Sequence, residues 1–165
     1  MQVRSAITAD AKRISSLIRE LSGSFMLSSN GKGAKPFLDS IGEPAIRSYI
    51  AAKDFSYLIA EVGSELAGVV ALRDKRHLYH LFVAQAHQGK GIGRGLWLMV
   101  KESALGAGNN GDFTVNSSLN AVPVYERFGF SPIGAKVEKN GVVFLPMQWI
   151  SSKDGDRVFH QADNF

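Results

Sequence analysis

The chain has 165 residues, 45% of them hydrophobic, which is enough for one domain with a substantial core. It contains no cysteine, which excludes disulfides, thiolate metal sites and a cysteine nucleophile. The net charge of +4 is scattered, and no apolar run reaches the roughly 20 residues of a membrane-spanning helix, so neither a nucleic-acid nor a membrane partner is expected.

The first third of the chain predicts one strand and two helices. Residues 2–7 alternate enough for a short strand, and residues 8–10 supply a capping hydroxyl and an acid for a helix start. Hydrophobic residues then recur at helical spacing, at Ile14, Leu17, Ile18 and Leu21. Residues 22–35 are rich in serine and glycine, which is typical either of a lid over a binding site or of a surface loop. Residues 36–53 predict a less regular second helix, interrupted by a glycine and a proline.

The middle of the chain predicts three strands followed by a helix. Residues 55–62 and 66–72 have the apolar, β-branched character of strands, and Gly63-Ser64 between them suits a tight hairpin turn. Residues 77–83 form the next strand. Residues 91–104 form the helix that follows it.

The last third predicts a strand, a helix and a hairpin. Residues 113–116 form the strand, and residues 121–128 form a short helix. Residues 130–137 and 142–150 are joined by Asn140-Gly141, a dipeptide that favours a hairpin turn. This order combines a meander with crossovers, which predicts a mixed sheet covered by helices.

The most informative segment is the run from Gln88 to Gly95, in which four glycines alternate with Lys90, Ile92 and Arg94. The run lies between a predicted strand and a predicted helix, so its backbone N–H groups and the helix dipole form an anion site. Glycine allows the backbone to approach a ligand closely, and Lys90 and Arg94 add positive charge. The segment therefore predicts a cradle for a diphosphate.

Two common phosphate-binding patterns do not fit this run. A nucleoside-triphosphate loop requires Ser or Thr after Gly-Lys, but Gly91 follows Gly89-Lys90. A dinucleotide fingerprint requires glycine at its sixth position, where this chain has Arg94 or Leu96. A glycine-rich turn that merely caps a core helix is the structural alternative.

The pattern Gln88-x-x-Gly91-x-Gly93 resembles the acetyl-CoA pyrophosphate loop of the GNAT superfamily of N-acetyltransferases. Ile7-Thr8-x-Asp10-Ala11 resembles the start of that family's first strand–helix unit. The segment 118–130 resembles the one that closes its cofactor site, through Ser118, Ala121, Tyr125, Glu126, Gly129 and Phe130. The resemblance covers residues 2–150 and implies an α/β fold, with a central, mostly antiparallel, twisted sheet of about seven strands flanked by about four helices.

The resemblance also implies acetyl-CoA as acetyl-donor cosubstrate and assigns residues to it. The strand ending in Leu81, Phe82 and Val83 would splay from its neighbour and pair with the pantetheine arm, with an N–H near Leu81 or Phe82 facing the thioester oxygen. The pyrophosphate would lie on Gln88, Gly89, Lys90, Gly91, Ile92, Gly93 and Arg94.

Two residues of segment 118–130 complete this assignment. Tyr125 stands at the position of the family's usual general acid. Ser118, seven residues earlier, stands where the family often has Asn, so one hydroxyl contact would replace an amide.

The general base is the part of the site that the sequence specifies least. An alkylamine with a pKa near 10.4 arrives protonated, so a base must take its proton. His77 resembles by position a residue that faces the amine in relatives, and strand alternation puts it on one face with Tyr79 and Leu81. His80 points the other way unless a bulge shifts the register. Glu61 on the adjacent strand is a third candidate, and ordered water is a fourth.

The sequence therefore predicts a direct-transfer N-acetyltransferase acting on a primary amine of a small molecule, a peptide N-terminus or a lysine. Residues 22–35 and the helix that follows them would shape the acceptor site, and Asp39 and Glu43 either attract a cationic amine or are surface charges. A non-catalytic acyl-CoA-binding or sensing module on the same fold and a different nucleotide-binding enzyme are the alternatives. Residues 1–150 are expected to form the domain and 151–165 a polar tail. A cytoplasmic location, because the first residues lack a signal-peptide core, and a homodimer are also expected.

Overall fold

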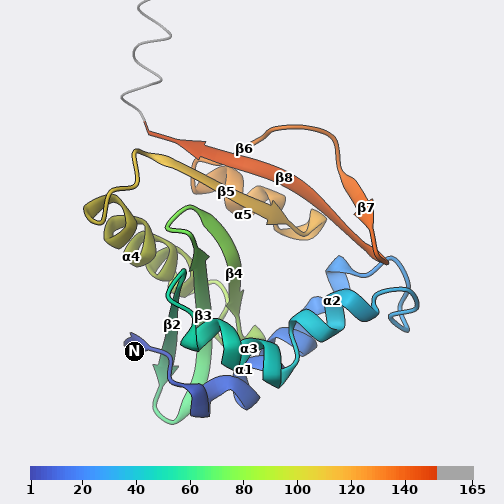
Figure 1. Cartoon of the computed structure of the whole chain (residues 1–165), viewed down its shortest axis with the longest axis horizontal. Helices are drawn as coiled ribbons and strands as arrows, with labels where there is room; N and C mark the ends of the chain where they lie inside the picture. Colours follow the sequence, from blue (N-terminus) through green and yellow to red (C-terminus); the bar gives the residue numbers. More distant parts are fainter. Residues whose placement is uncertain (152–165) are drawn as a thin grey trace, which may run out of the picture.

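The computed structural model of the chain describes residues 1–151 as an open mixed sheet with helices on both of its faces (Figure 1). The sheet has eight strands in the order β1-β2-β3-β4-β5-β8-β6, with β7 beside β8. The strands are β1 (Gln2–Ser5), β2 (Phe55–Val62), β3 (Glu65–Arg73), β4 (His77–Val83), β5 (Asp112–Ser117), β6 (Ser131–Pro132), β7 (Val137–Lys139) and β8 (Val142–Ile150). The α-helices are α1 (Ala11–Leu21), α2 (Lys35–Ser40), α3 (Glu43–Ala51), α4 (Ile92–Gly106) and α5 (Val122–Arg127). The mixed, helix-covered sheet confirms the predicted fold class.

The middle of the sheet is a parallel pairing with only two residue pairs in the described chain. His77 lies opposite Thr114 and Leu78 opposite Val115, and the β4–β5 ladder ends there. The other strand pairings are antiparallel, and β5 stays paired with β8 as far as Ser117. Strands β4 and β5 therefore diverge into a wedge after Leu78.

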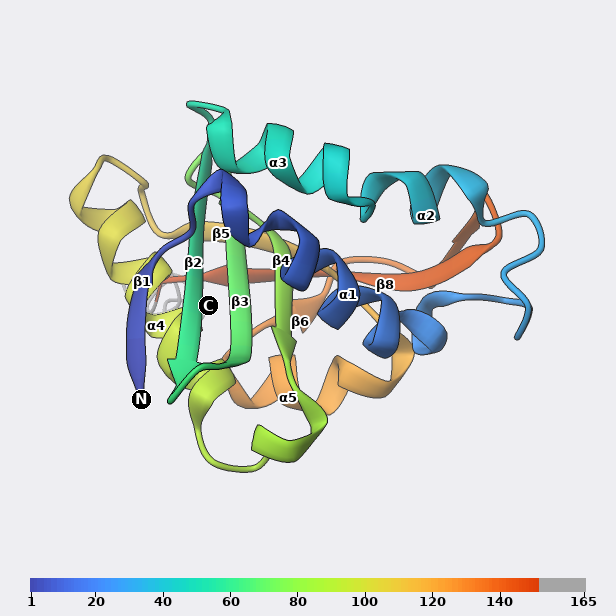
Figure 2. The ribbon, with the colours of Figure 1, turned by 90° about the horizontal axis from the view of Figure 1, so that it is seen from below.

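Two hydrophobic clusters hold the layers together. On one face, α1 and α3 bury Ile14, Ile18 and Ile46 against β2 and β3. On the other face, α4 buries Trp97, whose ring meets Phe113 edge-on with centroids 5.2 Å apart. Figure 2 shows the strands between α2 and α3 at the top of the view and α5 at the bottom. The wedge therefore opens within a sheet that is covered by helices on both faces.

Two predicted elements are divided in the structure. The predicted helix 36–53 is two helices, α2 and α3, because Gly42 separates them and a proline stands in the first turn of each. The predicted strand 130–137 is reduced to β6 and β7, each paired with β8. Pro132 cannot donate a backbone hydrogen bond to the ladder, which is consistent with the short β6.

The serine- and glycine-rich loop is an ordered part of the described chain. It begins with a short 3-10 helix, Ser22–Phe25, and Met26 forms a bridge with Val142 at the start of β8. The N–H of Leu27 donates to the carbonyl of Gly141, at 2.9 Å. The loop is thus joined to the β7–β8 turn.

The start of α1 differs from its prediction. The predicted hydroxyl cap before α1 is wrong, because the Asp10 carboxylate accepts the hydrogen bond from the Ile7 N–H, at 2.8 Å. The predicted tail lies outside the described residues apart from Ser151. None of the helices in residues 1–151 has the length and hydropathy needed to cross a membrane.

Candidate active site

The wedge between β4 and β5 exposes backbone groups of β4. The N–H of Ala84 donates to Ala67 on β3, at 2.8 Å, whereas the carbonyl of Val83 accepts from the Gln88 side chain, at 3.0 Å. Because successive strand residues direct their backbone groups to opposite edges, Leu81 and Val83 face the wedge and Phe82 faces β3. Of the two predicted N–H groups, the structure therefore offers that of Leu81 to a ligand in the wedge.

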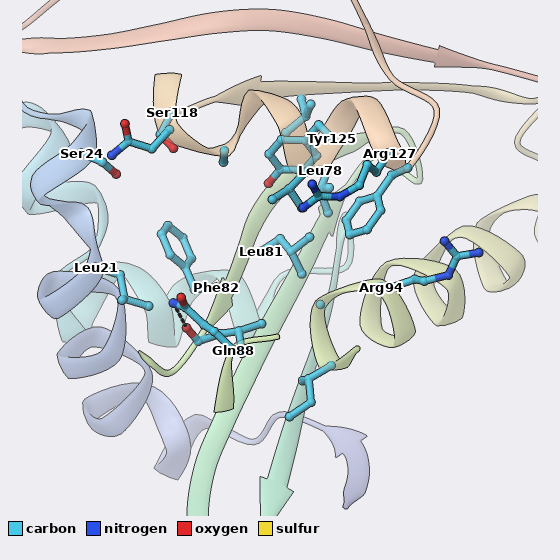
Figure 3. Close-up of a pocket in the computed structure, with 18 of the residues that line it drawn as sticks. Leu21, Ser24, Leu78, Leu81, Phe82, Gln88, Arg94, Ser118, Tyr125 and Arg127 are labelled. Carbon is cyan, nitrogen blue, oxygen red and sulfur yellow. Dashed lines mark hydrogen bonds between the residues drawn. The ribbon is translucent and has the colours of Figure 1, made fainter. Parts of the chain in front are cut away.

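A cavity of about 600 Å³ occupies the wedge (Figure 3). This volume is within the usual range of small-molecule and cofactor sites. Most residues that the sequence assigned to the cofactor or to acid catalysis line it, namely Leu81, Phe82, Val83, Gln88, Gly89, Gly91, Ile92, Gly93, Arg94, Ser118 and Tyr125. One end of the cavity is thus the glycine loop, and the other is the segment before and within α5.

The glycine loop has the geometry of an anion cradle. Gly89 and Gly91 have φ of 75° and 82°, which non-glycine residues adopt only with strain. A Cβ at either position would meet nothing within 4 Å, so the backbone borders open space. The first helical hydrogen bond of α4 runs from the N–H of Gly95 to Gly91, at 2.9 Å, which leaves the preceding N–H groups at the helix start available. These features fit a bound pyrophosphate.

The charged side chains near the loop differ from the prediction in part. Lys90 lies outside the cavity lining, and its Nζ donates to the Ala86 carbonyl at 3.3 Å. Arg94 belongs to the lining, but its side chain extends away along α4 (Figure 3). Arg127 points into the cavity from the end of α5, a position that sequence reasoning missed. No motif marked Arg127, because only the fold brings α5 opposite the glycine loop.

Tyr125 presents its hydroxyl to the cavity (Figure 3). The residue is 7% exposed, and its ring packs edge-on against Phe130 with centroids 5.6 Å apart. Burial raises the pKa of the Tyr125 hydroxyl above its ordinary value, so the group stays protonated at neutral pH. A fixed, protonated hydroxyl in this position can donate a proton to a leaving group.

A bulge in β4 decides which side chains face α1 and α3. Ala71 of β3 lies opposite His80, and Leu72 lies opposite Leu78, so Tyr79 is an extra residue in the ladder. Tyr79 therefore packs with the same cluster as Phe82, whereas Leu81 packs with the other. The predicted shared face of Tyr79 and Leu81 is wrong for this reason.

The bulge brings both candidate histidines to a second cavity, of about 180 Å³. It lies between α2, β4 and β8, and the lining of both cavities includes Phe25, Leu78, Tyr79, Phe82 and Asn116. The two cavities therefore meet where β4 and β5 diverge. Sequence reasoning missed Phe25 as a lining residue, although it is one of three apolar residues in an otherwise polar loop.

The two histidines differ in their partners. His77 Nδ1 lies 2.8 Å from Thr114 Oγ1, and burial, with a smaller effect of Arg73 and Arg76, lowers the pKa of His77 to about 4. His80 Nδ1 lies 2.9 Å from the Tyr57 hydroxyl, and burial lowers the pKa of His80 to about 3. Both imidazoles are therefore neutral at physiological pH, so each has one ring nitrogen that donates and one that accepts a hydrogen bond.

The third candidate base is not at the site. Glu61 lies in neither cavity lining. Its carboxylate oxygens pair with Arg4 and Arg13, each at 2.8 Å, and these bonds lower the pKa of Glu61. The predicted role of Glu61 as a base is therefore wrong, because the carboxylate is occupied in joining β1, α1 and β2.

Comparisons with known proteins agree with this architecture. The GNAT acetyltransferase domain model matches residues 26–151. The structure is similar to a GCN5-related N-acetyltransferase (aminotransferase, class II) from Rhodopseudomonas palustris, with a TM-score of 0.75, 18% identity, and coverage of 91% of this chain and 95% of that one. It is also similar to PaiA N-acetyltransferase from Thermoplasma acidophilum in complex with coenzyme A, with a TM-score of 0.72, 15% identity, and coverage of 91% and 98%.

A third similar structure is an aminoglycoside 6′-N-acetyltransferase complexed with coenzyme A, with a TM-score of 0.65, 12% identity, and coverage of 90% and 96%. The comparison with curated proteins gave no match. The structural likenesses show the fold, and the domain model covers most of the chain. The chain therefore belongs to the GNAT family of acetyltransferases.

Proposed function

We propose that this protein transfers an acetyl group directly from acetyl-CoA to a primary amine, with both substrates bound together. The observation that carries the proposal is one continuous space that contains the glycine cradle, the free edge of β4 and the Tyr125 hydroxyl. The two structural neighbours that hold coenzyme A support the choice of donor.

The donor side of the site is built largely from backbone. The N–H groups of the glycine loop and the start of α4 would bind the pyrophosphate. The wedge-facing carbonyl of Leu81 and N–H of Val83 would hydrogen-bond the pantetheine arm as a missing strand would. This alignment would place the thioester where the two cavities meet.

The chemistry requires three groups at that junction. The Leu81 N–H would donate to the thioester oxygen and stabilise the negative charge that develops there. With Nδ1–H donating to Thr114 Oγ1, His77 Nε2 would carry the lone pair that takes a proton from the amine, directly or through water. As the new N–C bond forms and the C–S bond breaks, Tyr125 would protonate the sulfur.

The acceptor would enter through the second cavity. A small-molecule amine, a peptide N-terminus and a lysine all carry the required nucleophile. The aminoglycoside acetyltransferase among the structural neighbours supports an amine acceptor. The cytoplasmic location and the homodimer stay predictions.

Release of free coenzyme A thiol in the presence of a panel of amines tests this function. The chain has no cysteine, so a thiol-reactive dye reports only the released coenzyme. Amine-dependent release would support the transferase. Tight acetyl-CoA binding without release for any amine would instead favour the non-catalytic acyl-CoA module.

A further inference from the structure

The second cavity carries no ionic side chain among residues 1–151. Its walls are mostly aromatic and aliphatic, from Phe25, Phe37, Ile41, Leu78, Tyr79, Phe82, Val142 and Phe144. Its polar members are Ser40, His77, His80 and Asn116. Neutral histidines cannot balance a positive charge. A cationic group that enters this cavity therefore finds no counterion in the described chain.

The acids predicted as possible attractors of a cation are engaged outside this cavity. Asp39 pairs with Lys35 at 2.7 Å, and Glu43 pairs with Arg47 at 2.6 Å. Neither acid lines the cavity. Both are surface ion pairs within a helix, which corresponds to the surface-charge alternative left open by the sequence.

Two arginines act on the cavity wall, although each also pairs with an aspartate, Arg73 with Asp74 at 3.9 Å and Arg76 with Asp112 at 3.0 Å. The Arg73 guanidinium lies 5.3 Å from the centroid of the Tyr79 ring, and Arg73 is the β3 partner of His77. Arg73 and Arg76 both act to lower the pKa of His77, so their field reaches the cavity wall. A second ammonium group on an acceptor would be desolvated in this field without a carboxylate to pair with.

The size of the cavity limits the body that carries the amine. A cavity of roughly 150 Å³ lined by aliphatic and aromatic residues can hold a benzene ring. The volume of about 180 Å³ therefore suits one ring or a short alkyl chain, with the amine directed toward the junction. Phe82 and Phe25, whose ring centroids are 6.3 Å apart, border that junction.

We infer that the acceptor is a monoamine on a compact, uncharged apolar body, such as an arylalkylamine or a short alkylamine, and not a polyamine. The inference rests on the proposed acetyltransferase function and adds to it the class of the acceptor. It follows from four features of the second cavity. Its wall carries no charged side chain, and Asp39 and Glu43 are paired outside it. Two arginines act on its wall, and its volume suits only a small body.

Matched amines separate charge from length and test the inference at pH 8. Hexylamine and 1,6-diaminohexane differ by one ammonium group, and phenethylamine and spermidine extend the comparison. We expect kcat/KM, measured by coenzyme A release, to be at least about 100-fold higher for the two monoamines. Calorimetric titration of the free chain with the same amines should show the same preference without turnover.

A pair of variants keeps the test specific to this cavity. Phe144→Glu places a carboxylate in the wall, and Phe144→Gln places a neutral group of the same shape there. We expect Phe144→Glu, and not Phe144→Gln, to reduce the preference against 1,6-diaminohexane by about 10-fold or more. Urea unfolding of both variants checks that the fold is kept.

Equal or faster acetylation of 1,6-diaminohexane or spermidine by the wild type would overturn the inference and leave the acetyltransferase function intact. Absence of acetylation for every amine, with acetyl-CoA bound, would remove the proposed function and the inference with it. An equal shift in Phe144→Glu and Phe144→Gln would also contradict the inference, because charge would then not govern the preference.

Discussion

His77 and Thr114 are joined twice at the point where the sheet opens. They are partners in the parallel β4–β5 ladder, and His77 Nδ1 lies 2.8 Å from Thr114 Oγ1. The strands diverge one residue pair later, after Leu78 and Val115. The ring of His77 is therefore fixed at the narrow end of the wedge, with Nε2 as its remaining nitrogen.

Loss of this contact should affect turnover. In Thr114→Val the strand keeps a β-branched residue but loses the hydroxyl, so the His77 ring is no longer held in one orientation. We expect kcat to fall by about 10-fold, the equivalent of one hydrogen bond, with an unchanged acetyl-CoA Kd. Thr114→Ser should restore most of the rate. An unchanged kcat in Thr114→Val would contradict the role given to His77.

Removal of the Tyr125 hydroxyl tests the proposed acid. Tyr125→Phe keeps the packing against Phe130 and removes the proton donor. We expect kcat to fall by about 100-fold, a typical effect for general acid catalysis. Acetyl-CoA binding and urea unfolding should stay close to wild type. A kcat near the wild-type value would show that another group protonates the sulfur.

Burial of His80 predicts a pH-dependent stability. Its folded pKa is about 3, and its unfolded pKa is near 6.5. Below pH 6.5 the unfolded chain binds a proton that the folded chain does not, so the free energy of unfolding falls as the pH drops toward 3. Between pH 7.5 and 5 this loss amounts to about 2 kcal/mol. Above about pH 7.5 His80 contributes no pH dependence.

Urea unfolding at pH 7.5 and 5 measures this effect. His80→Gln can still hydrogen-bond the Tyr57 hydroxyl, through its amide oxygen or its amide N–H, but does not titrate, so it should lose less stability than wild type over the same range. The difference between the two proteins isolates His80 from the other histidines. Equal losses would mean that His80 is charged in the folded protein.

Glycine at position 141 allows the β7–β8 turn to contact the 22–35 loop. A Cβ on Gly141 would lie 2.5 Å from the Gly33 carbonyl carbon and 2.6 Å from the Ala34 nitrogen, so the loop backbone would have to move. We expect Gly141→Ala to raise the acceptor KM by about 10-fold without changing the acetyl-CoA Kd. Gly63→Ala, at a glycine that also has a positive φ but where a Cβ meets nothing within 4 Å, is the matched control. Equal KM values for the two variants would show that the loop does not shape the acceptor site.

The sequence predicted the residues that line the first cavity better than those that line the second. The glycine loop can be recognised from one short run of the sequence. Its glycines with positive φ lie next to one another at the start of a helix, so no distant residue is needed to identify it. The second cavity depends on the extra residue Tyr79, which turns His80 to the face of Phe82. Strand alternation cannot reveal such a bulge, because the shift arises from pairing with β3.

Long-range contacts explain the remaining differences. Glu61 has a carboxylate that could act as a base, but Arg4 and Arg13 form ion pairs with it from other elements. Arg127 has no local signal, and only the position of α5 brings it to the cavity. Such contacts join residues far apart in the sequence, and no short motif records them.

Calorimetric titration with acetyl-CoA tests the central claim most directly, in wild type, Gly91→Asp and Gly63→Asp. Both variants add the same charge at a glycine with positive φ and open space around it, but only Gly91 lies in the cradle. We predict micromolar binding by wild type and Gly63→Asp, and loss of binding in Gly91→Asp. No binding by wild type, or equal binding by all three proteins, would contradict the account.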